Sequence, residues 1–228
     1  MLGIIGAMDT EIKHFYNVME VESVCEISGM VFYKGKICGQ DVVMVKSGVG
    51  KVFAAICSQT LIYHYKPDLI INTGVGGALD PDLELLDIVI ADEVLQHDMD
   101  TTAAGAGLGL ISGINKIYFQ CDAAAVKKIG SAADRIGLKH SRGRIATGDC
   151  FITDNTKSQF IRETFKASIC EMEGGAIGQV CYVNSVPFCV IRAVSDRADH
   201  NADIDYPTLV HRAAKQSFSV LFEFIKSL

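Results

Sequence analysis

The chain is poor in positive charge, and it contains no long apolar run and no closely paired cysteines. Its 21 lysine and arginine residues face 27 aspartate and glutamate residues, which gives a net charge of −6. This balance argues against a nucleic-acid partner, because phosphate backbones attract clustered basic residues. No apolar run reaches the roughly 18 residues of a membrane-spanning helix, so the sequence predicts no membrane partner. The apolar start, residues 1–6, is too short for a signal peptide and has no basic region, so we expect a cytoplasmic location.

The eight cysteines form no C-x-x-C pair, and most of them sit inside apolar runs. This pattern predicts buried free thiols rather than disulfides or a zinc site, and we expect no metal. Tryptophan is absent, which excludes nothing, and the four prolines leave most of the chain free to form regular elements. No internal repeat or low-complexity segment occurs.

The chain is 49% hydrophobic and 21% charged, which is typical of a globular protein with a sizeable core. Short apolar runs predict strands at residues 2–7, 30–38, 41–46, 68–72, 87–95, 139–147 and 187–194. Helical spacing of apolar residues predicts helices at 9–19, 50–65, 122–136, 155–165, 174–184 and 208–226. The alternation predicts an α/β fold with a mixed, mostly parallel sheet covered by helices on both faces. No linker interrupts it, so we expect one domain over residues 1–228.

Two polar clusters follow apolar runs near the C-terminus. They are Glu171-Met172-Glu173 and Arg192-Ala-Val-Ser195-Asp196. In open α/β sheets, ligands bind at the carboxyl ends of strands, so these clusters predict the rim of a site. Taken singly, each charged residue is as consistent with a surface salt bridge as with a role in a binding site.

Glycine-rich and acidic turns follow the earlier strands. Glu11 lies in the first turn of a predicted helix. There its carboxylate either interacts favourably with the positive end of the helix dipole or acts as a general base. Ser47-Gly-Val-Gly-Lys51 lacks the spacing of a phosphate-binding P-loop, and we expect the Lys51 side chain in solvent. The glycines of residues 73–77, predicted as a loop, fit either a tight crossing or a bound ligand. Residues 105–113 are predicted to be irregular.

Two further motifs have a structural and a functional interpretation. His97-Asp98-Met-Asp100 suggests a metal site, but alternation along a strand would separate the side chains, so a hydrogen-bonded cluster is favoured. Phe151 follows a strand and a turn, where an aromatic ring either stacks on a planar base or fills the core.

Together and in this order, the motifs resemble the bacterial 5′-methylthioadenosine/S-adenosylhomocysteine nucleosidases of the nucleoside phosphorylase superfamily. The matching stretches run from the first strand to the last helix: Gly3-Ile-Ile-Gly-Ala-Met8 with Glu11, Ser47-Gly-Val-Gly-Lys51, Asn72-Thr-Gly74, His97-Asp98-Met-Asp100, Thr147-Gly-Asp149-Cys-Phe-Ile152, Glu171-Met-Glu173, Arg192-Ala-Val-Ser-Asp196 and Ala213-Ala-Lys-Gln-Ser217. The resemblance implies a nucleoside phosphorylase-like fold and hydrolysis of the N-glycosidic bond of methylthioadenosine, adenosylhomocysteine and 5′-deoxyadenosine. It implies no cofactor and a place in methionine salvage.

The resemblance also implies residue roles. Asp196, held by Ser195, would protonate adenine, and Glu11 would activate the attacking water. Glu173 would bind the ribose hydroxyls with support from Met172 and Arg192. The remaining substrate contacts implied are Phe151 and Ile152 at adenine, and Ala7, Met8, Val49 and Tyr206 elsewhere, Tyr206 near the 5′ substituent. In a homodimer, the partner's segment at Thr101 and Ala104 would close the 5′ pocket.

Two positions depart from the family pattern. Val75 replaces a serine beside the ribose, and Ala104 replaces an aromatic residue, so the 5′ pocket is expected to be wider. The preferred 5′ substituent therefore stays open. Adenine recognition does not depend on these positions.

Two other functions remain as alternatives. A phosphate-dependent phosphorylase of the same fold would need cationic or backbone donors for phosphate. Glu11 would repel that anion, and no arginine precedes Arg135. A non-catalytic nucleoside-binding protein is allowed by the fold, but the expected acid, base and ribose carboxylate are all present.

Overall fold

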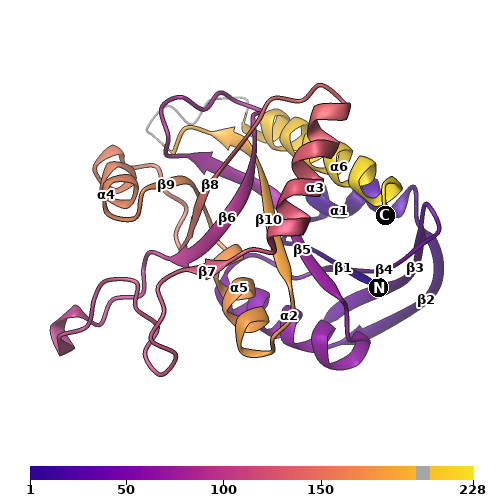
Figure 1. Ribbon diagram of the computed structural model, residues 1–228, viewed down its shortest axis with the longest axis horizontal. Coiled ribbons are helices and arrows are strands. Elements are labelled where there is room, and N and C mark those ends of the chain that lie inside the picture. The colour runs from indigo at the N-terminus through magenta and orange to yellow at the C-terminus, as the bar shows by residue number, and fades with distance from the viewer. Residues whose placement is uncertain (199–205) are drawn as a thin grey trace.

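A computed structural model describes residues 1–198 and 206–228 of the chain (Figure 1). The strands are β1 (Leu2–Gly6), β2 (Glu20–Ile27), β3 (Met30–Ile37), β4 (Gln40–Lys46), β5 (Leu69–Ala78), β6 (Ile88–Gln96), β7 (Phe119–Gln120), β8 (His140–Thr147), β9 (Ala167–Glu171) and β10 (Phe188–Asp196). The helices are α1 (Asp9–Tyr16), α2 (Lys51–Tyr65), α3 (Ala123–Arg135), α4 (Asn155–Phe165), α5 (Gly174–Val183) and α6 (Tyr206–Lys226), with a 3₁₀ turn η1 (Thr102–Ala104).

The strands form one mixed sheet in the order β10-β6-β8-β9-β5-β1-β4-β3-β2. Parallel pairings join β1 to β4 and β5, β10 to β5, and β8 to β6 and β9. Because β10 pairs with both β6 and β5, the strands β10, β6, β8, β9 and β5 close into a ring. The α/β fold class with a mixed sheet is confirmed, and the ring places the ends of β5, β9 and β10 next to one another.

Helices cover both faces of the sheet, as predicted. Along β1, a Cβ at Gly3 would meet Leu61 of α2, whereas a Cβ at Gly6 would meet Ile12 of α1. Residues three apart in a strand point to opposite faces, so α1 and α2 lie on opposite sides. Figure 1 shows α3 and α6 on the side of α1, and α5 beside α2.

Strand β5 is longer than the sequence predicts. The prediction ended the strand at residue 72 and placed a loop at 73–77, but β5 continues through the glycines to Ala78. The prediction was wrong because glycine usually weakens a strand interior. Here the glycines make room: a Cβ at Gly74 would overlap the Glu11 carboxylate, and one at Gly77 would lie 2.7 Å from Asp196 Oδ1.

Other elements differ less. Strand β2 was not predicted, because it lies at the sheet edge with nearly every residue exposed and so carries no apolar alternation. The hairpin of β3 and β4 is confirmed, and Cys38 and Gly39 take positive φ angles in its turn. Residues 105–113 follow an irregular path, as predicted.

All eight cysteines are free, and five are buried: Cys57, Cys121, Cys170, Cys181 and Cys189. Cys25, Cys38 and Cys150 are exposed, so burial is confirmed for most of them rather than for all. In the described ranges, no helix has the length and apolarity needed to cross a membrane.

Candidate active site

A cavity of about 160 Å³ opens where the carboxyl ends of β1, β5, β9 and β10 meet. Most of the predicted site residues line it: Ala7, Met8, Glu11, Val49, Val75, Phe151, Ile152, Met172, Glu173, Ser195 and Asp196. Residues far apart in the sequence thus meet at the carboxyl ends of the strands, where the polar clusters predicted a site.

Glu11 is fixed by backbone donors from the turn after β1 and from β5. Its Oε2 accepts hydrogen bonds from Ala7 N at 2.7 Å and Met8 N at 2.9 Å, and its Oε1 accepts one from Val75 N at 3.0 Å. Glu11 is the third residue of α1, from which a glutamate side chain can reach back to the N–H of the N-cap residue Met8. Burial raises the pKa of Glu11 despite the lowering effects of Arg192 and the three N–H donors.

Asp196, the last residue of β10, is oriented by its own neighbours. Ser195 Oγ donates to Asp196 Oδ2 at 2.8 Å, and Ala198 N donates to Oδ1 at 2.9 Å. The carboxylate lies against Gly77 of β5, its partner in the strand register. The site therefore presents a buried carboxyl group on the side of the cavity formed by β10.

Glu173 forms a third carboxylate of the cavity. Its Oε1 accepts a hydrogen bond from Gly50 N at 2.8 Å, which links the start of α5 to the start of α2. Burial and then the neighbouring Glu171 raise the pKa of Glu173, and Arg192 opposes them. Glu171 ends β9 and Glu173 precedes α5, so the two neighbouring carboxyl groups belong to different elements.

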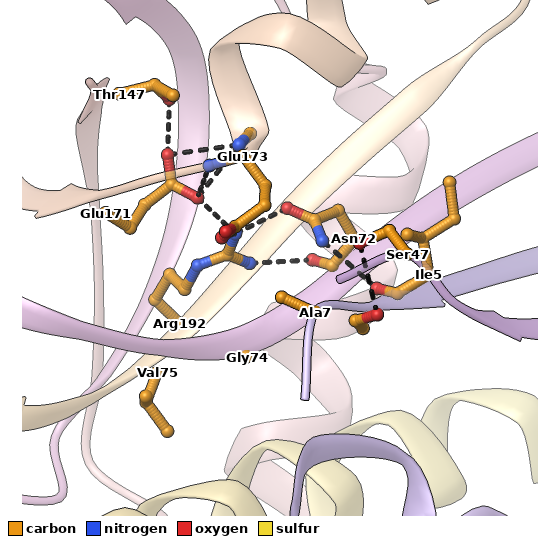
Figure 2. A network of polar contacts seen from close by, with 12 residues as sticks. Ile5, Ala7, Ser47, Asn72, Gly74, Val75, Thr147, Glu171, Glu173 and Arg192 are labelled. Carbon is orange, nitrogen blue, oxygen red and sulfur yellow. Dashed lines mark hydrogen bonds and ion pairs between the residues drawn. The ribbon is translucent and has the colours of Figure 1, made fainter. Parts of the chain in front are cut away.

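Arg192 lies behind the cavity and is not among the residues that line it, so its expected part in substrate binding stays a prediction. Its side chain is about 1% exposed, and Nη2 binds Glu171 and Asn72 (Figure 2). Glu173 Oε2 is 3.9 Å from the same nitrogen, so Glu171 is the main ionic partner. A buried guanidinium is costly unless an opposite charge lies close to it, and Glu171 supplies that charge.

Sequence reasoning did not assign roles to the partners of Arg192. Asn72 Nδ2 donates to Ile5 O at 3.0 Å, and Glu171 accepts from Thr147 Oγ1 and from Gly174 N. This network joins β1, β5, β8, β9 and β10 beneath the cavity (Figure 2). The only sequence signal was that each of these polar residues sits in or at the end of an apolar strand.

The loop after β8 carries the aromatic residue of the site. Phe151 is 49% exposed at the cavity mouth, whereas Ile152 is 4% exposed. The loop is tied to the rest of the site, since Lys51 N donates to Asp149 Oδ1 at 2.7 Å and Asp149 N donates to Asp98 Oδ2 at 2.9 Å. The predicted hydrogen-bonded cluster is confirmed only in part, because Asp98 and Asp100 have hydrogen-bond partners but the buried His97 Nε2 has none among the described residues. Lys51 is paired with Asp98 at 2.7 Å rather than free in solvent.

Two predicted residues, Thr101 and Ala104, do not line the cavity of this chain. Thr101 and Ala104 lie at η1, in a segment that projects away from the sheet (Figure 1). The Tyr206 side chain lies outside the described residues. Among the described residues, no group of three or more His, Cys, Asp or Glu is arranged to hold a metal ion.

The geometry supports acid–base chemistry on a small ligand. Four carboxyl groups line one buried space. Glu171 is paired with Arg192, and Glu11, Glu173 and Asp196 each have a separate set of hydrogen-bond donors. Different surroundings can push the pKa values of carboxyl groups apart, so that one donates a proton while another accepts one.

The sequence matches known proteins over its whole length. The phosphorylase superfamily model matches residues 1–226. The chain is 40% identical over 229 residues to the 5′-methylthioadenosine/S-adenosylhomocysteine nucleosidase of Shewanella halifaxensis, covering 100% of this chain and 99% of that protein. The nucleosidase of Haemophilus influenzae is also 40% identical, over 228 residues and with the same coverage.

Solved structures agree with these matches. The nucleosidase of Neisseria meningitidis in complex with methylthio-immucillin-A has a TM-score of 0.95 and 34% identity, covering 100% of this chain and 99% of that chain. The futalosine hydrolase of Helicobacter pylori strain 26695 has a TM-score of 0.95 and 29% identity, covering 100% and 97%. Full-length identity and a shared fold therefore show that the chain belongs to the 5′-methylthioadenosine/S-adenosylhomocysteine nucleosidases of the phosphorylase superfamily.

Proposed function

We propose that this protein hydrolyses the N-glycosidic bond of 5′-methylthioadenosine and S-adenosylhomocysteine, and also of 5′-deoxyadenosine, releasing adenine. The observation that carries the proposal is the convergence of Glu11, Glu173 and Asp196 on one cavity. The names of the full-length relatives support the same reaction.

Asp196 is the proposed general acid. Breaking the glycosidic bond requires adenine to leave as a neutral base, which a proton delivered to N7 permits. General acid catalysis of this kind contributes about 10²–10⁴-fold. Ser195 supports this role by holding Oδ2 of Asp196, and Phe151 and Ile152 are placed to contact the base.

Glu11 and Glu173 are proposed to act on the ribose side. As adenine leaves, positive charge develops on the ribose, and Glu173 in its ionised form stabilises that charge while accepting hydrogen bonds from the hydroxyl groups. Glu11 takes a proton from the water that attacks the sugar, and a pKa raised by burial makes it a better base. Ala7, Met8, Val49 and Met172 complete the lining around the nucleoside.

The charge of the lining favours water over phosphate as the attacking group. The described residues that line the cavity include Glu11, Glu171, Glu173 and Asp196 but no lysine, arginine or histidine. Phosphate binding needs donors that offset its charge, and Glu11 would repel it. This composition argues against the phosphorylase alternative.

We also infer a homodimer. Helix α2 begins beside the cavity and exposes Val52, Phe53 and Ile56, with 69%, 52% and 41% of their surfaces accessible. Large exposed apolar patches mark interaction sites in soluble proteins. A second copy packed on α2 would bring its projecting η1 segment, with Thr101 and Ala104, toward the 5′ end of the nucleoside. The cytoplasmic location and the place in methionine salvage remain predictions from the sequence and the resemblance.

Kinetics of two variants test the proposed roles. Asp196→Asn and Glu11→Gln preserve shape but remove the acid and the base, so each should lower kcat by at least about 10²-fold with an unchanged melting temperature. Full activity in either variant would contradict the mechanism. Comparing kcat/KM among methylthioadenosine, adenosylhomocysteine, 5′-deoxyadenosine and futalosine then gives the preferred 5′ group, which the Val75 and Ala104 positions leave open.

A further inference from the structure

Three residues from separate segments form a closed set of contacts at the mouth of the cavity. Lys51 Nζ donates to Asp98 Oδ1 at 2.7 Å, Lys51 N donates to Asp149 Oδ1 at 2.7 Å, and Asp149 N donates to Asp98 Oδ2 at 2.9 Å. We propose that Lys51, Asp98 and Asp149, here called the Lys51 triad, are positioning residues that hold the adenine and ribose side of this chain's site and the segment that reaches the partner's 5′ pocket in one arrangement. This inference rests on the proposed function.

Each member of the triad is adjacent to a different part of the site. Lys51 follows Gly50, whose N–H binds Glu173, and Val49, which lines the cavity. Asp149 precedes Cys150 and Phe151, which also line it. Asp98 leads into the segment that carries Thr101 and η1. The triad therefore connects the ribose carboxylate, the aromatic residue at the base and the segment expected to reach the partner's 5′ pocket.

The local backbone is built around these contacts. Gly50 has a φ of 99°, a conformation that L side chains rarely adopt, and a Cβ there would lie 3.0 Å from Asp149 Oδ1. A glycine thus lets the loop after β8 approach the start of α2. The same residue gives its N–H to Glu173 rather than to the loop, so the two interactions share one backbone turn.

Partial burial makes the ion pair more than a surface contact. The Lys51 and Asp98 side chains are 20% and 30% exposed, against 41% and 60% for the distant pair of Lys36 and Asp41. Partial burial alone would raise the pKa of Asp98, but the bonds from Lys51 and Asp149 lower it below its ordinary value. Removing the ammonium group would leave the Asp98 carboxylate without its cation, and only the backbone bonds to Asp149 and Asp98 would still hold the two loops against the start of α2.

The test compares Lys51→Met with Lys51→Arg and with the control Lys36→Met. Losing a hydrogen-bonded charge should weaken adenine binding, measured by calorimetry, by about tenfold in Lys51→Met. The ratio of kcat/KM for methylthioadenosine and adenosylhomocysteine should change by about threefold, because both ends of the site are affected. Lys51→Arg should restore most of both properties, and Lys36→Met should change neither.

The proposal is overturned if Lys51→Met binds adenine and discriminates between the substrates as the wild type does, or if it loses only thermal stability. If Lys51→Met does not fold, Asp98→Asn serves in its place, with the same expected changes and the same contradicting results. Adenine affinity needs no turnover, so it tests the triad even if the wild-type protein releases no adenine. An inactive wild type would instead contradict the proposed function.

Discussion

At the scale of single residues, the glycines of β5 are as important to the site as the carboxylates. Gly74 lies against Glu11, and Gly77 lies against Asp196. A side chain at either position would occupy the space that a carboxylate needs, while the strand pairing of β5 would stay possible. The absence of a side chain at these positions is therefore a requirement of the chemistry rather than of the fold.

Gly74→Ala should lower kcat by at least about 10²-fold, because the added Cβ overlaps Glu11 Oε1 and displaces the base. The measurement is steady-state kinetics together with thermal melting. Gly130→Ala in α3 is the control, since its Cβ would lie 3.3 Å from the His140 ring and 3.8 Å from Ile90 Cδ1 and would touch no residue of the cavity. Wild-type kcat in Gly74→Ala would show that the position of Glu11 does not matter.

Glu173→Gln should make the protein more stable at high pH. The pKa of Glu173 is raised in the folded state to about 8, by burial and then by Glu171. A group with a raised pKa stabilises the fold at low pH, and this contribution is lost as pH rises through the folded-state value. The gain in free energy of unfolding should therefore be larger at pH 9 than at pH 5.

Urea denaturation at both pH values measures this difference, with Glu22→Gln on the exposed strand β2 as the control. An equal effect at the two pH values would mean that Glu173 titrates normally. A loss of activity alongside the gain in stability is expected, because strained or buried charges at active sites commonly reduce stability.

The sequence located most site residues but not their contacts. Glu11, Glu173 and Asp196 could be selected because acids follow apolar strands and begin helices. The ionic partner of Arg192 could not be predicted from the sequence. Glu171 and Glu173 are two residues apart, and only the path of the chain between β9 and α5 decides which carboxylate the guanidinium contacts. The ion pair between Lys51 and Asp98 was also missed, and Lys51 was expected in solvent. The two residues are 47 positions apart in the sequence, so no local pattern reveals the contact.

At the scale of elements, the Arg192 network holds the strand ends together beneath the cavity. Arg192 of β10 bonds Asn72 of β5 and Glu171 of β9, and Asn72 in turn bonds β1. The ring closure between β10 and β5 places these strands side by side. Because the network holds the strand ends in place, it also fixes the positions of the carboxylates that line the cavity above it.

Arg192→Met should lower the free energy of unfolding by about 3–5 kcal/mol, because it leaves the buried Glu171 carboxylate without its cation. Arg142→Met is the matched control, since Arg142 pairs with Asp92 on an exposed part of the sheet and should change stability by only about 0–1 kcal/mol. Chemical denaturation of both variants checks this. Equal effects would show that the Arg192 network contributes no more than a surface ion pair.

Element prediction succeeded for α4 and for the fully buried strands β1 and β10, and it failed where glycines or full exposure hide the pattern. Helix α4 begins and ends where the sequence predicts. Strand β5 was cut short because its glycines are read as a loop, and β2 was missed because an exposed edge strand has no buried face. Closure of β10 onto β5 and β6 could not be predicted, since it depends on pairings between distant segments.

At the scale of the whole molecule, α2 and the η1 segment are the parts that we expect to meet a second copy of the chain. Double substitution of Phe53 and Ile56 by lysine should convert a dimer into a monomer, because both apolar side chains are exposed on α2. Sedimentation measures the assembly, and kcat/KM should fall by about tenfold or more if the partner closes the 5′ pocket. Val24→Lys on β2, at an exposed apolar residue elsewhere, is the control.

A wild-type protein that sediments as a monomer would contradict the dimer directly. If the wild type is a dimer and the monomeric variant has full activity, the dimer inference stands. The expected role of Thr101 and Ala104 in the 5′ pocket would then be contradicted.

The central claim is that water, activated at Glu11, cleaves the bond to adenine. Incubating the protein with 5′-methylthioadenosine in ¹⁸O-labelled water, with and without phosphate, tests it most directly. We predict free adenine and a 5-methylthioribose carrying one ¹⁸O atom, formed at the same rate in both conditions. A sugar 1-phosphate formed only with phosphate, or no adenine in either condition, would contradict the account.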